Sequence, residues 1–149
     1  MNDFNRALDF ALKWEGNKYV VDTGGATRWG ISQHAFPTMT SHEIENLTKE
    51  QAGQLYYLHY WKLGGCEQME WPLCLVAFDT SVNLGLSKAN KFYNEVLSLD
   101  KLASDRILAA GILSKREEFY KRLGAREKYK PYLKGWLNRC EDLRKEAKL

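Results

Sequence analysis

The chain has 149 residues, of which 44% are hydrophobic and 28% charged, with a net charge of +3. These values are typical of a single globular domain with its own core, spanning residues 1–149, and so small a net charge argues against a dedicated nucleic-acid binder. No apolar run is long enough to span a bilayer. Residues 1–16 lack the basic and apolar segments of a signal peptide, so we expect synthesis in the cytoplasm.

The first predicted helix begins after Asn2 or Asp3, either of which can cap it, and ends near Trp14, because apolar residues recur there at helical spacing. A glycine-rich region over residues 16–34 follows. Its short segments on either side of Gly24 and Gly25 predict a small β-hairpin.

The remaining sequence predicts helices. Residues 37–50 indicate a loop and a short helix, and Thr48 with Gln51 forms a capping-box pattern at the start of the next one. An apolar helix is predicted from residue 73 to the stop at Gly85. Further helices are expected over residues 87–98, 102–123 and 131–148. The expected fold is therefore mainly α (α+β), with the irregular hairpin region near residues 16–34.

The cysteines and histidines do not predict a metal site. Cys66, Cys74 and Cys140 are an odd number without a paired motif, and the three histidines are scattered. We expect no disulfide framework, no metal and no cofactor.

Glu15 is the leading candidate for chemistry. A carboxyl group at the end of a helix, next to Trp14, is poorly placed for a negative charge. Such a position favours the protonated acid that glycoside hydrolysis requires. Asp22 would carry the persistent charge, and Thr27 would orient a water molecule. The residues alone leave open a plainer interpretation, in which the aspartate caps a turn and the glutamate is a surface residue.

The segment "WEGNKYVVDTGGATRWGIS" resembles the opening motif of glycoside hydrolase family 108, the phage-associated N-acetylmuramidases. The matching residues are Glu15, Gly16, Tyr19, Asp22, Gly24, Gly25, Thr27, Gly30 and Ile31. Residues 47–61, 75–85 and 122–139 resemble later motifs of the family in the same order.

This resemblance implies a lysozyme-like fold and a peptidoglycan hydrolase that cleaves the β-1,4 bond between N-acetylmuramic acid and N-acetylglucosamine. Glu15 carries over as the catalytic acid, with Asp22 and Thr27 as the matching Asp and Thr. The chain has Asn17 and Lys18 where the family has a further glycine, and its Glu-to-Asp interval is shorter. The role of Asp22 is therefore less secure, and a lytic transglycosylase acting on the same bond remains an alternative.

Five other residues are candidates for binding the substrate. Aromatic side chains can stack on sugars, glycine lets the backbone approach a ring, and Asn83 can hydrogen-bond an acetamido group. These residues are Tyr19, Gly25, Trp29, Tyr60 and Asn83. Helical spacing equally suits core packing for the aromatic residues, and Asn83, with Asp79 on the same helix face, can brace a neighbouring loop.

The last 35 residues are basic, with twelve Lys and Arg against six Asp and Glu from Lys115 onward. They could attract the anionic outer-membrane surface, or form a helix that packs apolar side chains on the core; the second interpretation is favoured and does not exclude the first. The side chains expected in that core are Tyr132, Leu133, Trp136, Leu137 and Leu143.

Taken together, these features predict a monomeric endolysin that acts on peptidoglycan glycan strands in the periplasm or cell wall after release through a holin-type pore. The alternative from another class is a non-catalytic wall-binding or helical nucleic-acid-binding module.

Overall fold

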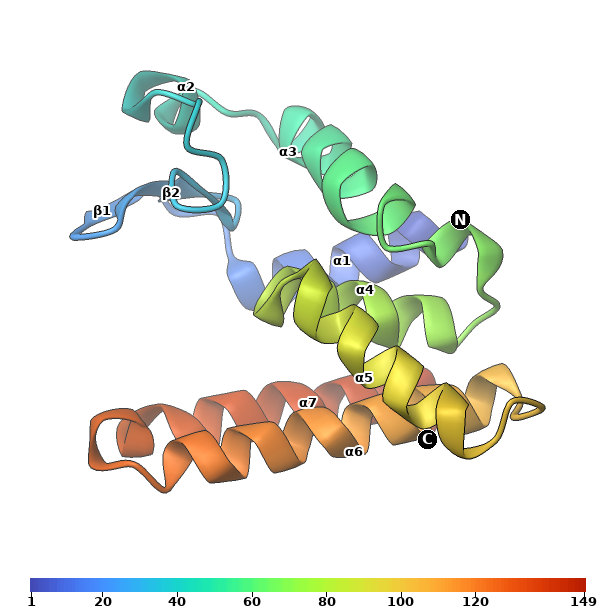
Figure 1. Cartoon of the computed structure of the whole chain (residues 1–149). Coiled ribbons are helices and arrows are strands. Elements are labelled where there is room, and N and C mark those ends of the chain that lie inside the picture. The colour runs from blue at the N-terminus through green and yellow to red at the C-terminus, as the bar shows by residue number, and fades with distance from the viewer.

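The computed structural model describes residues 1–149 and is mainly helical, with one small sheet (Figure 1). The α-helices are α1 (Asp3–Glu15), α2 (Ser41–Glu45), α3 (Lys49–Tyr56), α4 (Leu73–Leu84), α5 (Leu86–Leu99), α6 (Asp105–Gly124) and α7 (Leu133–Ala147). A π-helix, η1 (Tyr57–Lys62), continues α3, and two 3₁₀ segments, η2 (Cys66–Gln68) and η3 (Glu127–Tyr132), precede α4 and α7. The expected mainly α fold is confirmed.

The sheet contains three short antiparallel strands in the order β1 (Val20–Asp22), β2 (Gly25–Arg28) and β3 (Ile31–Ser32). Asp22 pairs with Gly25, whose positive φ of 102° suits the tight turn that joins the first two strands. The hairpin expected around Gly24 and Gly25 is therefore confirmed. Ala26 and Ile31 are fully buried beneath the sheet, where α2 packs against β2.

Local sequence signals set the helix boundaries. The side chain of Asn2 accepts a hydrogen bond from the Asn5 amide and caps α1. Thr48 and Gln51 form the predicted capping box at the start of α3. Gly85, with a φ of 90°, separates α4 from α5. The irregular η1 segment was not predicted.

Helix α4 is the centre of the core. It packs against α1, α5, α6 and α7, and its residues from Leu73 to Ser81 are all buried. Phe78 is fully buried and makes edge-to-face contacts with Phe4 and Trp61. Burying a side chain of this size contributes about 2–3 kcal/mol by area, so this aromatic cluster fixes α1 against α4.

Helices α6 and α7 form an antiparallel pair along one side of the molecule (Figure 1). Leu143 is fully buried, and Leu133, Trp136 and Leu137 pack against the core as expected. The expectation for Tyr132 is wrong, because its side chain is 59% exposed. Tyr132 ends the η3 segment between the two helices, and its ring stacks on that of Trp136 at the surface.

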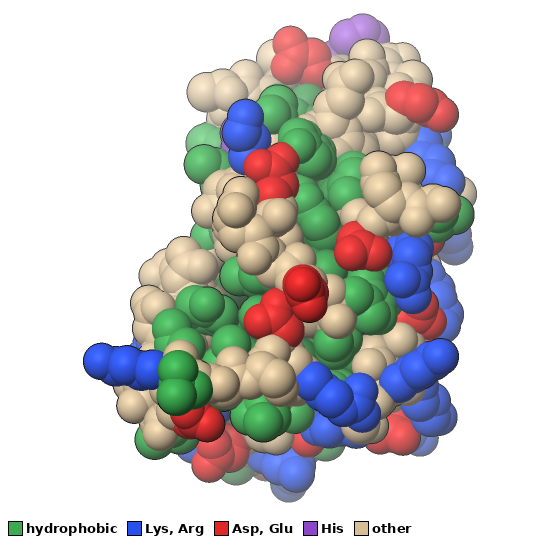
Figure 2. All heavy atoms as spheres, turned by 90° about the vertical axis from the view of Figure 1, so that its right-hand side faces the viewer, with side chains coloured by type: hydrophobic (Ala, Val, Ile, Leu, Met, Phe, Trp, Pro, Cys, Tyr) green, Lys and Arg blue, Asp and Glu red, His purple; other side chains and the backbone are tan.

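The charges of the basic C-terminal segment are partly paired. Lys13 contacts Asp142 at 2.7 Å, and Arg144 contacts Glu117 at 2.6 Å. Figure 2 shows basic, acidic and hydrophobic side chains interspersed over one face of the molecule. No helix is both long and apolar enough to cross a bilayer. All three cysteines are free and buried.

Candidate active site

Glu15 is the last residue of α1, and Gly16, with a φ of 76°, turns the chain out of the helix toward the sheet. The Glu15 side chain is 23% exposed, so most of it is shielded from water while part remains accessible. Gly30 lies against it, since a methyl group at Gly30 would come within 2.9 Å of the Glu15 Cβ. The tight turn after β2 therefore packs directly on the candidate acid.

Arg139 of α7 holds the Glu15 carboxylate. One guanidinium nitrogen, Nη1, donates to Glu15 Oε1 at 2.8 Å. No protein donor contacts the second carboxylate oxygen of Glu15. An adjacent arginine stabilises the charged form of a carboxylate, while burial stabilises the neutral form. The sequence predicted apolar surroundings for Glu15, and the structure adds the charged side chain of Arg139 to them.

The same arginine is anchored by Asp79 on α4. Its Nε and Nη2 donate to the two carboxylate oxygens of Asp79 at 3.1 and 2.7 Å, a bidentate arrangement. Arg116 of α6 donates to Asp79 Oδ2 at 2.8 Å. Burial would raise the pKa of Asp79, but the two arginines outweigh burial and lower it. Asp79 is therefore a buried anion that orients Arg139 toward Glu15.

Arg116 extends the network toward Asn83. Although fully buried, its guanidinium contacts Asn83 Oδ1 at 3.2 Å and Thr80 Oγ1 at 3.3 Å. The hydroxyl of Tyr120 also donates to Asn83 Oδ1. The carbonyl oxygen of Asn83 is thus used inside the protein, although its partners lie in helix α6 and not in the neighbouring loop that the bracing interpretation expected, and only its amide nitrogen is free for a ligand.

Asp22 and Thr27 share one face of the sheet. Thr27 pairs with Val20 in β1, two residues before Asp22, and side chains two residues apart on a strand point to the same side. This face is opposite the one that carries buried Ala26. Asp22 is exposed, and its Oδ1 accepts a hydrogen bond from the Gly24 amide at 2.8 Å. The aspartate therefore also stabilises the hairpin turn, as its plainer interpretation proposed.

The other candidate residues differ in burial and in hydrogen bonding. The Trp29 indole donates to the Leu47 carbonyl at 3.0 Å, and the Trp29 carbonyl accepts from the hydroxyl of buried Tyr56 at 2.7 Å. Burial and the charge of Glu15 both raise the pKa of Tyr60. Tyr19 is half-buried just before β1, and Gly25 begins β2.

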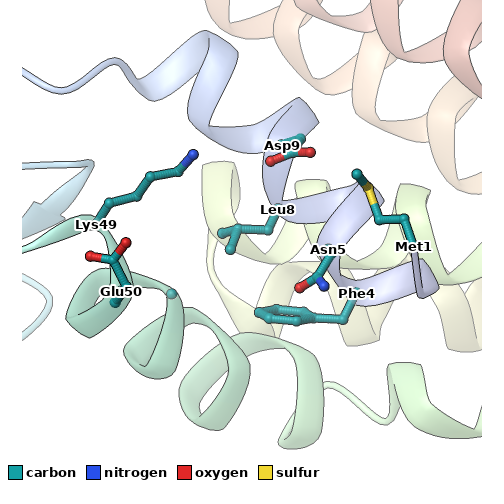
Figure 3. Close-up of a pocket in the computed structure, with 8 residues that line it drawn as sticks. Met1, Phe4, Asn5, Leu8, Asp9, Lys49 and Glu50 are labelled. Carbon is teal, nitrogen blue, oxygen red and sulfur yellow. The ribbon is translucent and has the colours of Figure 1, made fainter.

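The structure shows no cluster that could hold a metal ion, and it has a cavity that lies away from Glu15. No group of three or more His, Cys, Asp and Glu side chains is close enough to hold a metal ion. A cavity of about 470 Å³ lies between α1 and α3, away from the end of α1 that carries Glu15. The side chain of Lys49 on α3 extends toward Asp9 on α1 across this cavity (Figure 3).

Two residues of this site, Arg139 and Arg116, were not predicted from the sequence. A signal for the two arginines was present, because Asp79 lies in an apolar, buried helix and a buried carboxylate needs a cationic partner. That signal predicts a partner but does not indicate which of the 22 Lys and Arg residues it is.

Comparisons with known proteins identify the fold and the family of the chain. A solved structure of Brucella abortus SagA superposes with a TM-score of 0.80 at 22% sequence identity, covering 97% of this chain and 92% of that one, and shares its fold. No curated protein sequence matches the chain. The family model described as glycosyl hydrolase 108 matches residues 8–85, which is more than half of the chain and includes Glu15, the whole sheet and α4. The chain therefore belongs to glycosyl hydrolase family 108, and membership implies a glycosidase that acts on a polysaccharide.

Proposed function

We propose that this glycosidase is an N-acetylmuramidase that hydrolyses the β-1,4 bond between N-acetylmuramic acid and N-acetylglucosamine in peptidoglycan, with Glu15 as general acid. The observation that carries the proposal is the fixed, partly shielded carboxylate of Glu15, which Arg139 contacts at 2.8 Å and which lies within the matched residues. A general acid has to be held in one orientation against the leaving oxygen.

In the proposed mechanism the free oxygen of Glu15 donates a proton to the glycosidic oxygen. The bond between the sugar carbon and that oxygen then breaks, and a second carboxylate stabilises the positive charge that develops on the sugar. A water molecule attacks the same carbon and passes a proton to that carboxylate. Asp22 and Thr27 share the exposed face of the sheet that follows α1, and they are assigned to that second role. Arg139 acts as a positioning residue through its contact with Glu15.

A second candidate reaction is lytic transglycosylation, which cleaves the same bond without water and leaves a 1,6-anhydro end. The observation in its favour is the Asp22 side chain, whose Oδ1 is occupied by the turn amide of Gly24. An aspartate held by its own turn is less free to approach the sugar, and the transglycosylase reaction can proceed with Glu15 alone.

The first test compares the wild type with Glu15→Gln in a turbidity assay on Gram-negative cells with permeabilised outer membranes. The nearly isosteric change removes the acid, so we expect clearing by the wild type and a loss of more than about 100-fold in rate by the variant. Glu45→Gln is the matched control, because Glu45 is also the last residue of a helix. Its side chain makes no hydrogen bond to a residue of the site, and only its backbone carbonyl is hydrogen-bonded to another side chain. Equal clearing by the wild type and the Glu15→Gln variant would contradict the assignment.

Mass spectrometry of the released fragments separates the two reactions. Hydrolysis adds one water to each cleaved bond and leaves a reducing sugar, whereas the transglycosylase product retains the mass of the uncleaved units. We further propose that the enzyme acts as an endolysin, reaching the wall through a holin-type pore; co-expression with and without a pore-forming protein, scored by culture lysis, tests that route.

A further inference from the structure

An aromatic stack lies at the corner between α6 and α7. The rings of Tyr120 and Trp136 are 5.1 Å apart with an interplanar angle of 22°, and those of Trp136 and Tyr132 are 5.9 Å apart at 25°. The other aromatic pairs of the molecule are tilted or edge-to-face, including the Phe78 cluster of the core. Exposure rises along the stack, from 2% at Tyr120 through a half-buried Trp136 to 59% at Tyr132.

The stack begins at the active-site network. Tyr120, its buried end, donates its hydroxyl to Asn83, which also contacts Arg116. The corner that carries the stack projects toward the same side of the molecule as β1 (Figure 1). The three rings therefore lead outward from the buried charges that support Glu15.

A second, independent relation connects the stack to Glu15 through α7. Trp136 lies three residues before Arg139 on one face of this helix, and Tyr132, the residue that precedes the helix, lies seven before Arg139. The Cα atoms of Tyr132 and Arg139 are then separated by about 10 Å along the helix axis. Since Arg139 contacts Glu15, the helix face that leads away from the candidate acid carries Trp136, and Tyr132 stacks on that ring just before the helix begins.

Core packing accounts for only part of this arrangement. It explains Tyr120 and Trp136, but the Tyr132 ring leaves more than half of its surface in water. Tyr132 has one aromatic neighbour, Trp136, and forms no hydrogen bond through its hydroxyl. A flat ring stacked on another at the surface leaves its outer face open for a third flat group.

We propose that Tyr132, supported by the ring of Trp136, forms a sugar-binding platform for the glycan strand, on the α7 side of Glu15. A pyranose ring presents a face of C–H groups, which carry partial positive charge, and the face of an aromatic ring is negative. This inference rests on the proposed function, because the occupant is the polysaccharide that Glu15 cleaves. The platform lies outside residues 8–85, so the family comparison does not assign it.

The platform acts on binding rather than on the chemical step. It lies about two helical turns from the residue that holds Glu15, so it contacts sugar units beyond the cleaved bond. A contact made equally in the ground state and the transition state changes KM and leaves kcat unchanged. Loss of the Tyr132 ring should therefore raise KM for long glycan strands.

The experiment measures binding and turnover separately. Binding to purified peptidoglycan sacculi is measured by co-sedimentation in the Glu15→Gln background, and turnover in the wild-type background. We expect Tyr132→Ala to weaken binding and raise KM by about tenfold, as for loss of a stacking contact with a flat ring, with kcat unchanged. Tyr132→Phe keeps the ring and should behave as the wild type. Leu102→Ala removes a 94% exposed apolar side chain between α5 and α6 and is the matched control.

The outcomes separate this inference from the proposed function. Activity of the wild type with unchanged binding and KM in Tyr132→Ala would overturn the platform alone. A wild type that neither binds nor cleaves sacculi would overturn both. If Tyr132→Ala changes the elution volume in size-exclusion chromatography but not glycan binding, the ring belongs to a protein interface and the platform is wrong. Circular dichroism confirms that each variant is folded.

Discussion

Substituting Arg139 by methionine tests whether the buried charge network supports the site. The change keeps an unbranched side chain of similar length but removes three charge-assisted hydrogen bonds, two to Asp79 and one to Glu15. Asp79 remains fully buried and retains Arg116, which contacts it at 2.8 Å. The variant therefore leaves the aspartate with one cation in place of two.

The expected loss follows from these contacts. Removing one partner of a buried ion pair lowers the free energy of unfolding by about 3–5 kcal/mol. Because Arg116 still neutralises Asp79, we expect the lower end, about 3 kcal/mol, which corresponds to a fall in Tm of roughly 9 °C for a chain of this size. Arg139→Lys keeps the charge but not the bidentate geometry, and it should lose about half as much.

Urea denaturation followed by circular dichroism measures the loss. Arg144→Met is the matched control on the same helix, because its ion pair with Glu117 joins side chains that are 30% and 25% exposed; we expect at most about 1 kcal/mol there. A fall of less than about 1 kcal/mol for Arg139→Met, or equal losses for both variants, would refute the reasoning. Arg139→Lys should also slow peptidoglycan cleavage by about tenfold or more, since it leaves Glu15 less well oriented.

Other contacts in the structure lead to three further predictions. Gly30→Ala should reduce both stability and lytic rate, because the new methyl group would overlap the Tyr56 hydroxyl and press on Glu15; Gly65→Ala, with a similar φ of 72° and no neighbour within 4 Å, should show backbone strain alone in the same assays. Stability should fall in acid, because burial would raise the pKa of Asp79 but its two arginines lower it; the stabilisation is present above the unfolded pKa of about 4 and is lost as pH falls through the lower folded pKa. Urea titrations from pH 6 to pH 2 should show this loss in the wild type and a smaller loss in Arg139→Met, where a single arginine lowers the pKa of Asp79; equal losses in the two proteins would contradict it. The buried thiols should not react with Ellman's reagent at pH 8 until urea unfolds the protein, because burial raises the pKa of Cys140 to about 11 and leaves about one thiolate per thousand; prompt reaction of the native protein would show that the thiols are accessible.

The secondary structure was largely predictable because its signals are local. The capping box at Thr48, the stop at Gly85 and the turn at Gly24 each depend on residues within four positions of one another. Such interactions are specified by short stretches of sequence whatever the rest of the chain does. The boundaries of α6 differ by three residues at its start, where Ser104 caps the helix in place of the expected beginning at Leu102.

The supporting network could not be read from the sequence because its contacts are distant. Arg139 joins Asp79 across 60 positions and Glu15 across 124. In the sequence both Arg116 and Arg139 lie among other charged residues and look like ordinary solvated positions on helices. Only the packing of α4 against α6 and α7 turns these two side chains inward, and that packing depends on the whole core.

The exposure of Tyr132 was missed for a related reason. Its spacing from Trp136 and Leu143 fits the buried stripe of a helix, so periodicity alone places it in the core. The structure begins α7 one residue later, at Leu133, and the preceding η3 segment carries Tyr132 past the edge of that stripe. Periodicity does not show where a helix leaves the core.

The contact between Glu15 and Arg139 also has a consequence during translation. Glu15 emerges from the ribosome early, but its arginine follows 124 residues later. Throughout most of its synthesis the nascent chain therefore carries a candidate acid with nothing to orient it. Truncated products that end before α7 share this defect, so assembly of the site coincides with completion of the last helix rather than with the appearance of Glu15.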